Sequence, residues 1–390
     1  MLIGEPSVMH VRVVAAVLLL VTGCAAEQKR GPSGEPVRIG YLNNASGAFA
    51  VPELQTGAEV AVAHLNRKGG LKNRPFELVT CPTDGTPEQS EKCAEKFVGE
   101  NVEVVVQGVD TGADAAMPKL NEAGIPLVGH VQFTPGLMNH KNAFFFGAAA
   151  VAYGTAALKY YADQGVKTVA WLLPESPTTH AFTDTVLTPA AKRFGLGYRS
   201  VYYPADNPGW ESLARTVATA EASGSIAATE DQCTHMVRAL REASYDGRIL
   251  AASCTGLPRS VGNQSIGVEL SSDFWHPTDP LSAPPANQEE IEEYRQAMKD
   301  AGHDEPVAGA VVSFADMMTL ARVLSTSDGT PEQALRAVKD LDSFLGPQIT
   351  CDHAWFGNSA CSTAVLFYRF QPNGALKAQI PDFIEVSKLG

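Results

Sequence analysis

Short apolar runs alternate with amphipathic segments along the first third of the chain. Val37 to Leu42 is an apolar run that ends in a polar loop, which is typical of a strand feeding a turn. Leu54, Ala58, Ala61 and Leu65 then recur at helical spacing until two glycines stop the pattern. Further strands are predicted at 75–81, 102–107 and 125–128, and further helices at 87–97 and 113–123.

The same rhythm restarts after three consecutive phenylalanines at 144–146. Such alternation predicts parallel sheets covered by helices on both faces, and the 390-residue chain exceeds the ~250 to 300 residues at which one core stops growing. We therefore expect an α/β protein with two doubly wound lobes. The second half predicts strands at 168–173, 197–203, 225–229 and 248–252, helices at 181–194, 210–223, 232–244, 288–301, 314–324 and 331–341, and hairpins over 349–384 with turns at 357–358 and 372–374.

The N-terminal apolar run, from Val13 to Val21, is too short for a membrane span of ~20 residues. Arg12 precedes the run, and small residues ending in Cys24 follow it, which is the pattern of a lipoprotein signal. We expect residues 1–23 to be a signal peptide and 24–36 a flexible tether. Acylated Cys24 would then anchor the exported protein to the outer face of the cytoplasmic membrane. The alternative is an ordinary secretory signal with a chance cysteine.

Six cysteines remain besides Cys24, and they fall along the chain as three neighbouring pairs. Six thiols allow 15 connectivities, of which we favour the sequential one. A metal site is the competing interpretation, but no CxxC or Cys/His ligand spacing accompanies these residues, so we expect no metal. The favoured disulfides are Cys81 with Cys93, Cys233 with Cys254, and Cys351 with Cys361.

The formal net charge of −13 argues against nucleic acid as a partner. The chain contains no GxSxG elbow, HExxH motif, P-loop or GxGxxG fingerprint, so a binding protein without a cofactor is favoured over an enzyme. A hydrolase with an unrecognised site is the remaining enzymatic alternative.

Polar residues follow most of the predicted strands, and ligands of open parallel sheets bind beyond the carboxyl ends of the strands. Several of these residues have an equally simple interpretation as helix caps or ordinary loop histidines. Three of these loops, at 43–46, 110–114 and 176–182, contain no Lys or Arg, which argues against phosphates and dicarboxylates. The candidate ligand-binding residues are Asn44, Ser46, Asp110, Thr111, His130, Val131 and Gln132 in the first lobe, and Thr178, Thr179, His180, Glu230, Asp231 and Ser253 in the second.

Several segments carry a family resemblance, among them Ile39-Gly40-Tyr41, Leu65 to Leu71 with its two glycines, and Ser313 to Asp316. Over residues 37–384 the chain resembles the branched-chain amino acid binding proteins, which are type I periplasmic binding proteins that serve ABC importers. The resemblance implies a three-stranded hinge and a cleft that ligand closes. We place the N-terminal lobe at 37–147 plus 286–342 and the C-terminal lobe at 148–285 plus 343–390.

The family's amino-acid site carries over only in part. Thr111 and the loop from His130 to Gln132 match places where first-lobe hydroxyls and amides hold the ligand carboxylate. The loop from Ser176 to His180 lacks the aromatic residue that often packs on the ligand, and the loop around Ser253 lacks the acid that commonly takes the ammonium. These two departures count against a free amino acid as the ligand. The hydroxyls, amides and histidines of the loops favour a small polar solute, which is an amino acid or a related amide or organic acid.

Two binding roles follow from these expectations. In the first, a monomeric lipoprotein captures the solute and delivers it to ABC permease subunits. In the second, the same cleft serves a ligand-sensing ectodomain that reports to a signalling receptor without transport.

Overall fold

The computed structural model describes positions 1 and 4 and residues 31–47, 50–204, 208–226, 228–303, 309–353 and 359–389. The signal peptide expected at 1–23, apart from those two positions, and the acylation site Cys24 lie outside the described residues. Within the described part, no helix has both the length and the apolar character needed to cross a bilayer.

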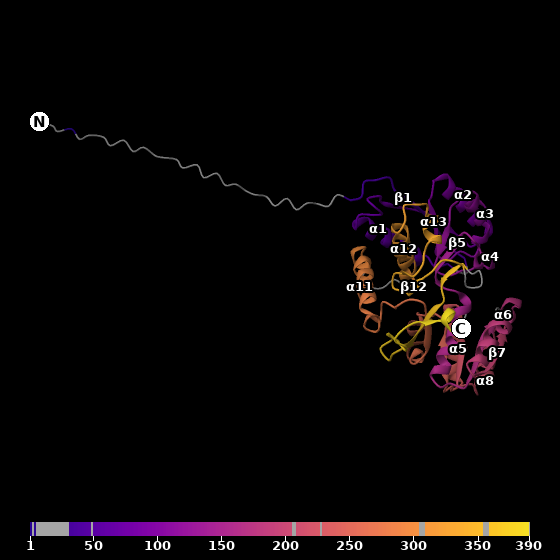
Figure 1. Ribbon diagram of the computed structural model, residues 1–390. Helices are drawn as coiled ribbons and strands as arrows, with labels where there is room; N and C mark the ends of the chain where they lie inside the picture. The colour runs from indigo at the N-terminus through magenta and orange to yellow at the C-terminus, as the bar shows by residue number, and fades with distance from the viewer. Residues whose placement is uncertain are drawn as a thin grey trace. The chain divides into compact units, whose positions relative to one another are not determined.

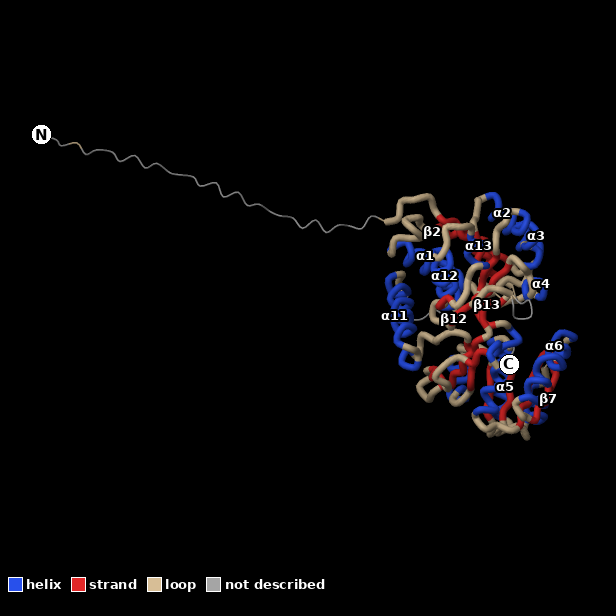
Figure 2. Tube along the Cα trace, viewed as in Figure 1, coloured by secondary structure: helices blue, strands red, loops and turns tan. Residues whose placement is uncertain are grey.

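The first sheet is parallel throughout, with the strand order β13-β5-β4-β3-β1-β2. Alternate side chains of β3 enter different cores: Val104 and Val106 pack with Phe314 of α12, whereas Val105 packs with Phe97 of α2. Helices therefore cover both faces of this sheet, as the sequence pattern predicts (Figures 1 and 2). The strands are β1 (Val37–Asn44), β2 (Phe76–Thr83), β3 (Val104–Gln107), β4 (Leu127–Gly129), β5 (Ala143–Ala148) and β13 (Ala360–Ser362), and the helices are α1 (Glu53–Arg67), α2 (Pro87–Gly99), η1 (Ala113–Ala115), α3 (Met117–Glu122), α4 (Pro135–Met138), α11 (Pro285–Asp300), α12 (Ala310–Ser325) and α13 (Pro331–Arg336).

The second sheet has the strand order β15-β14-β10-β9-β8-β6-β7, with β16 paired to β14. Its strands from β6 to β10 run parallel, while β14 and β15 add an antiparallel hairpin at one edge, which confirms the turn predicted at 372–374. The strands are β6 (Thr168–Pro174), β7 (Gly197–Tyr203), β8 (Ala222–Ser225), β9 (Arg248–Ala251), β10 (Glu269–Ser272), β14 (Ala364–Phe370), β15 (Leu376–Ala378) and β16 (Ile384–Glu385). The helices are α5 (Ala150–Asp163), α6 (Pro177–Phe182), the π-helical turn η2 (Thr183–Leu187), α7 (Thr188–Arg193), α8 (Trp210–Val217), α9 (Glu230–Glu242), α10 (Leu257–Val261), η3 (Gly262–Ser265), η4 (Pro280–Ser282) and η5 (Val386–Lys388).

Several sequence predictions in the second half are wrong. The strand predicted at 225–229 is β8, Ala222–Ser225, and the helix predicted to reach 223 ends at Val217. All four residues of β8 are buried and small, so the usual β-branched signal of a strand is missing. The segment 360–362, expected in a hairpin, instead pairs parallel to β5, whereas the turn predicted at 357–358 lies outside the described residues.

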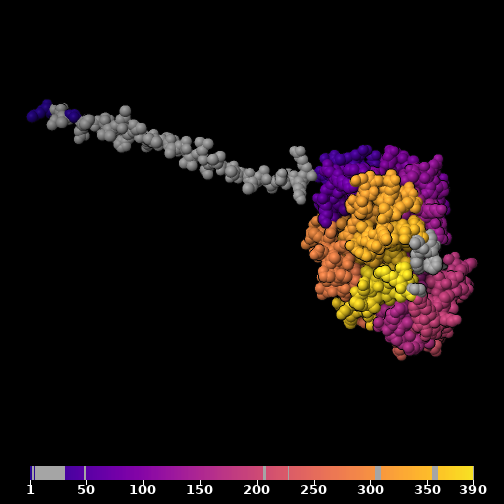
Figure 3. All heavy atoms as spheres, in the orientation of Figure 1, coloured from indigo at the N-terminus to yellow at the C-terminus, as the bar shows by residue number. Residues whose placement is uncertain are grey.

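The chain passes between the two sheets three times within the described residues. It leaves the first sheet after Ala148, returns after Ser272, and leaves it again between Ser362 and Ala364. The first and third crossings touch, because the Ala149 amide donates to the Ser362 carbonyl over 3.1 Å. The C-terminal segment, yellow in Figure 3, therefore contributes to both lobes, whereas the sequence placed all of 343–390 in the second.

The three disulfides follow the sequential connectivity that the sequence favours. Cys81 is bonded to Cys93, Cys233 to Cys254, and Cys351 to Cys361. The first bond ties α2 to β2 within the first lobe. The second fastens the start of α9 to the loop that follows β9, close to the carboxyl end of the second sheet.

Candidate functional site

The carboxyl ends of β1 and β2 carry a cluster of polar groups in the first lobe. The buried Asn44 side chain accepts a hydrogen bond from the Thr83 hydroxyl over 2.8 Å. Thr111, in the loop after β3, donates to the carbonyl of Gly85 over 2.9 Å, so the three loops are joined. Ser46 lies exposed in the turn after β1. The structure thus places Asn44 and Thr111 at one edge of the sheet.

Asp110 sits in the same cluster but is turned inward. One carboxylate oxygen accepts the Gly112 amide and the other accepts the Ser90 hydroxyl, each over 2.8 Å. Burial raises the pKa of Asp110, while these hydrogen bonds oppose the rise. Because both oxygens are occupied within the lobe, Asp110 shapes the loop after β3, in keeping with the simpler interpretation of this residue.

The loop after β4 holds His130 between two buried carboxylates. Its Nδ1 lies 3.0 Å from Oδ1 of Asp316 on α12, and its Nε2 lies 3.0 Å from Oδ1 of Asp273 after β10. Burial alone would lower the pKa of His130, but the two carboxylates raise it well above its ordinary value. In the same loop Val131 is half-buried, and the buried Gln132 donates to Ser359 over 3.4 Å.

The loop after β6 uses its polar residues mainly to begin α6. Ser176 is the N-cap, since its hydroxyl accepts the Thr179 amide over 3.1 Å. Thr178 is exposed in the first turn. His180 lies 2.6 Å from Glu175 and packs its ring on Tyr202 at a centroid distance of 3.9 Å.

The loops after β8 and β9 meet at Glu230. Its carboxylate accepts the Gly256 amide over 3.1 Å, and burial raises its pKa. Thr229 caps α9 through a capping box, so Asp231 is not the cap and instead lies 3.5 Å from His235 on the exposed side of the helix. Ser253 is exposed in the loop after β9.

Sequence reasoning found the strand-end loops but missed the residues that join the lobes. Asn44, Asp110 and Thr111 lie together in one lobe, and Glu230 lies beside the loop after β9 in the other. The contact across the lobes runs from His130 to Asp273, a residue that we did not predict. Asp273 directly follows β10, a strand that the sequence pattern did not predict, so no local signal marked this acid.

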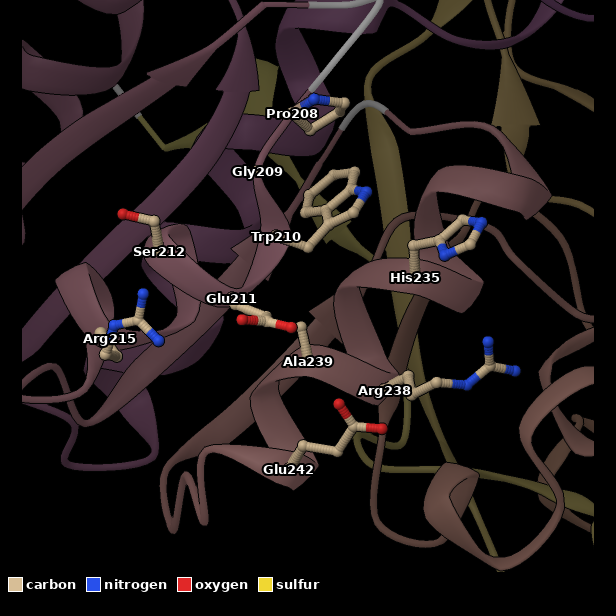
Figure 4. A pocket seen from close by; sticks show the side chains of 10 residues that line it. All are labelled: Pro208, Gly209, Trp210, Glu211, Ser212, Arg215, His235, Arg238, Ala239 and Glu242. Carbon is tan, nitrogen blue, oxygen red and sulfur yellow. The ribbon is translucent and has the colours of Figure 1, made fainter.

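A cavity of about 480 Å³ lies between α8 and α9 in the second lobe (Figure 4). Trp210 stands at its mouth and packs on Tyr203 at a centroid distance of 5.0 Å. None of the lining residues is among the predicted ligand-binding residues, and both acidic and basic side chains line the walls. The cavity is lined by Pro208, Gly209, Trp210, Glu211, Ser212, Arg215, His235, Arg238, Ala239 and Glu242.

No group of three or more metal-ligating side chains with a suitable arrangement occurs in the described part of the chain. The six thiols that could have held a metal are paired in the disulfides instead.

The half-buried ring of His276, three residues beyond Asp273, should make the folded protein less stable in acid. Burial lowers the pKa of His276 to about 4, with Asp279 opposing the fall. The unfolded chain takes up this proton near pH 6.5, so stability is lost as the pH falls from 6.5 towards 4. We expect His276→Gln to remove up to about 2 kcal/mol of this pH dependence, allowing for the partial exposure of the ring.

Chemical denaturation at pH 7 and pH 5 measures the effect. The exposed His235→Gln variant is the control and should lose stability in parallel with the wild type. An equal loss in the wild type and His276→Gln would contradict the prediction.

Residues 36–365 match the family model described as periplasmic binding protein. A Leu/Ile/Val-binding protein homolog 2 from Brucella abortus is 25% identical over 208 residues, which is 52% of this chain and 55% of that protein. The chain thus matches about half the length of this curated relative. The matched family is one of binding proteins, in agreement with the expectation that the chain is not an enzyme.

Solved structures reproduce the fold at low sequence identity. The substrate binding protein LivJ of the branched-chain amino acid transporter from Streptococcus pneumoniae, in complex with isoleucine, has a TM-score of 0.70 at 16% identity over 90% of this chain and 100% of its own. A fatty acid ABC transporter substrate-binding protein from Thermomonospora curvata has a TM-score of 0.71 at 14% identity over 92% and 95%. Proteins with similar backbones are thus named for different ligands.

Proposed function

The chain belongs to the periplasmic binding protein family, and on this premise we propose that it is the extracytoplasmic substrate-binding lipoprotein of an ABC importer. Acylated Cys24 anchors the monomer to the outer face of the cytoplasmic membrane. The body captures a small polar metabolite between its lobes and presents the closed form to the permease subunits.

The observation that carries the proposal is a pair of sheets whose parallel strands end in polar loops and which the chain connects at three crossings. Asn44 and Thr111 line one strand-end edge and Glu230 and Ser253 the other. Ligands of open parallel sheets bind at such edges. A ligand that contacts both edges only when they approach each other stabilises the closed form, so its differential affinity drives closure.

The ligand class follows from the groups that these loops offer. In these loops, hydroxyls, amides and backbone N–H groups outnumber charged side chains. The loops after β1, β3 and β6 contain no Lys or Arg over residues 43–46, 110–114 and 176–182. Both oxygens of Asp110 are engaged within the lobe, so this residue is a poor partner for a ligand ammonium. An amino acid, a related amide or a small organic acid fits these loops better than a phosphate does.

A thermal-shift panel tests the proposal. The mature body, beginning at Ala25, is stripped of co-purified ligand by unfolding and refolding, and is then screened against amino acids, amides, polyols and small organic acids. A ligand at about 1,000 times its dissociation constant should stabilise the protein by roughly 4 kcal/mol. Silence across the panel would count against capture of a small polar solute.

Substitutions place a hit in the proposed cleft. Ser253→Ala, at an exposed strand-end position, should weaken binding of the hit without changing the melting temperature of the free protein. Ser260→Ala, on the exposed side of α10, is the matched control and should bind normally. Equal affinities in both variants would place the ligand elsewhere.

Gene deletion separates transport from sensing. Loss of uptake of the hit with intact signalling supports the importer. Intact uptake with a lost transcriptional response to the same solute would favour the sensing ectodomain.

A further inference from the structure

We propose that His130 is the pin of the interlobe hinge: its imidazolium, bonded to Asp273 and Asp316, holds the crossing segments together, and loss of its proton loosens them. The consequence for ligand capture rests on the proposed function, whereas the pin itself does not.

Both ring nitrogens of His130 are placed to donate in this arrangement. Each nitrogen lies 3.0 Å from a carboxylate oxygen, and a neutral imidazole has one donor and one acceptor. A neutral ring would therefore turn a lone pair towards one of the two carboxylates. The imidazolium satisfies both partners, and the side chains of Asp273 and Asp316 are 3% and 2% exposed, so solvent screens the charges little.

Asp273 extends the contact to the first crossing. Its second oxygen accepts the backbone amide of Ala148 over 2.8 Å, and the Tyr153 hydroxyl at the start of α5 also donates to this carboxylate. The backbone joins as well, since the Gly147 amide donates to the His130 carbonyl over 3.0 Å. The Asp273 side chain, in the segment after β10, thus contacts both the loop after β4 and the end of β5.

Gly147 shows how closely these segments pack. A Cβ atom at this position would lie 2.4 Å from Oδ2 of Asp273 and 2.6 Å from the His130 carbonyl oxygen. Such distances leave no room for a side chain at Gly147, so β5 and the loop after β4 are in direct backbone contact beside His130.

Asp316 makes the charge of His130 necessary rather than merely favourable. It belongs to α12 of the first lobe, and its Oδ2 is buried with no hydrogen-bond partner among the described residues. If His130 became neutral, two buried carboxylates would face each other without the cation between them. Breaking a buried pair in this way should favour the opened crossing on the order of 100-fold.

The pH dependence has a definite sign. The titratable groups facing the pin are Asp273, Asp316 and the Tyr153 hydroxyl, with Tyr41 beyond Asp316. The carboxylates raise the pKa of His130 well above its ordinary value. The stability that the His130 proton contributes is therefore fully present near pH 6.5 and is lost as the pH rises through the folded pKa. Burial raises the pKa of Asp316, so acid first weakens the contact to α12.

The test uses the ligand-free mature chain, so its outcome is independent of the solute. Nitrogen-15 NMR of the histidine rings should show both nitrogens of His130 protonated at pH 7. In His130→Gln, the amide of Ala148 should exchange with solvent at least about tenfold faster, because Asp273 loses its cation. His64→Gln is the matched control: its side chain is 13% exposed, against 14% for His130, and its ion pair with Glu293 lies away from the crossings.

The Asp316→Asn variant gives a second test, because this substitution removes the charge but keeps the side-chain volume. His130 should then titrate at a lower pH than in the wild type, while the Asp273 contact keeps Ala148 protected. A neutral His130 ring at pH 7, or unchanged Ala148 exchange in His130→Gln, would overturn the proposal. If His130→Gln fails to fold, an unshifted His130 titration in Asp316→Asn would overturn it instead. If these measurements give the expected results but no compound of the thermal-shift panel binds, the inference about His130 stands and the proposed function is refuted.

Discussion

Replacing the buried carboxylate of Glu269 with an amide, Glu269→Gln, is expected to lower the free energy of unfolding by about 3 kcal/mol. Glu269, the first residue of β10, is fully buried and accepts the hydroxyls of Tyr160 and Tyr161 over 3.0 and 2.9 Å. Arg248 and Arg369 approach from the neighbouring strands β9 and β14. The variant leaves the two guanidinium groups without their anion at the start of β10.

Urea denaturation of the two proteins at pH 7 measures this loss. Glu77→Gln is the control, since Glu77 forms a more exposed pair with Arg38 and its removal should cost less than about 0.5 kcal/mol. Similar midpoints for Glu269→Gln and the wild type would show that the network contributes little to the second lobe.

Gly57→Ala is expected to destabilise the first lobe by at least about 2 kcal/mol, although alanine normally stabilises a helix interior by about 1 kcal/mol relative to glycine. Gly57 lies in α1, where α1 packs on the start of α12. A Cβ atom there would lie 1.9 Å from the carbonyl oxygen of Ala310, and backbone cannot move aside as a flexible side chain can. The two helices must separate to admit a methyl group.

Gly99→Ala is the matched control, because Gly99 ends α2 and nothing lies within 4 Å of a Cβ atom there. We expect Gly99→Ala to leave stability unchanged or to raise it by less than about 1 kcal/mol. Equal and small effects in both variants would mean that α1 and α12 pack less closely than the structure shows.

The first lobe was predictable because its apolar patterns are unambiguous. The strand that begins at Val37 is mostly apolar up to Leu42. The helix after it has its apolar residues at helical spacing and ends near two glycines, so local preference and burial agree. β8 was misplaced because Ala222, Ser223, Gly224 and Ser225 carry no strand signal of their own. Their small size suits a buried central strand, a property that only the packed sheet reveals.

The candidate site shows the same difference between features that are local in the sequence and contacts between distant residues. Loops after strands are visible in the sequence, and so are residues such as Ser176 that begin a helix. The partners of His130 are 143 and 186 residues away, and no local pattern connects them. The joining of the lobes could therefore be found only once the strand order was known.

Small-angle scattering of the mature body, with and without a saturating hit from the thermal-shift panel, tests the central claim most directly. Capture between two lobes predicts a smaller radius of gyration with ligand, and the same value as the free protein when a non-binding analogue is added. A ligand that stabilises the protein but leaves the radius of gyration unchanged would contradict closure of the lobes around it.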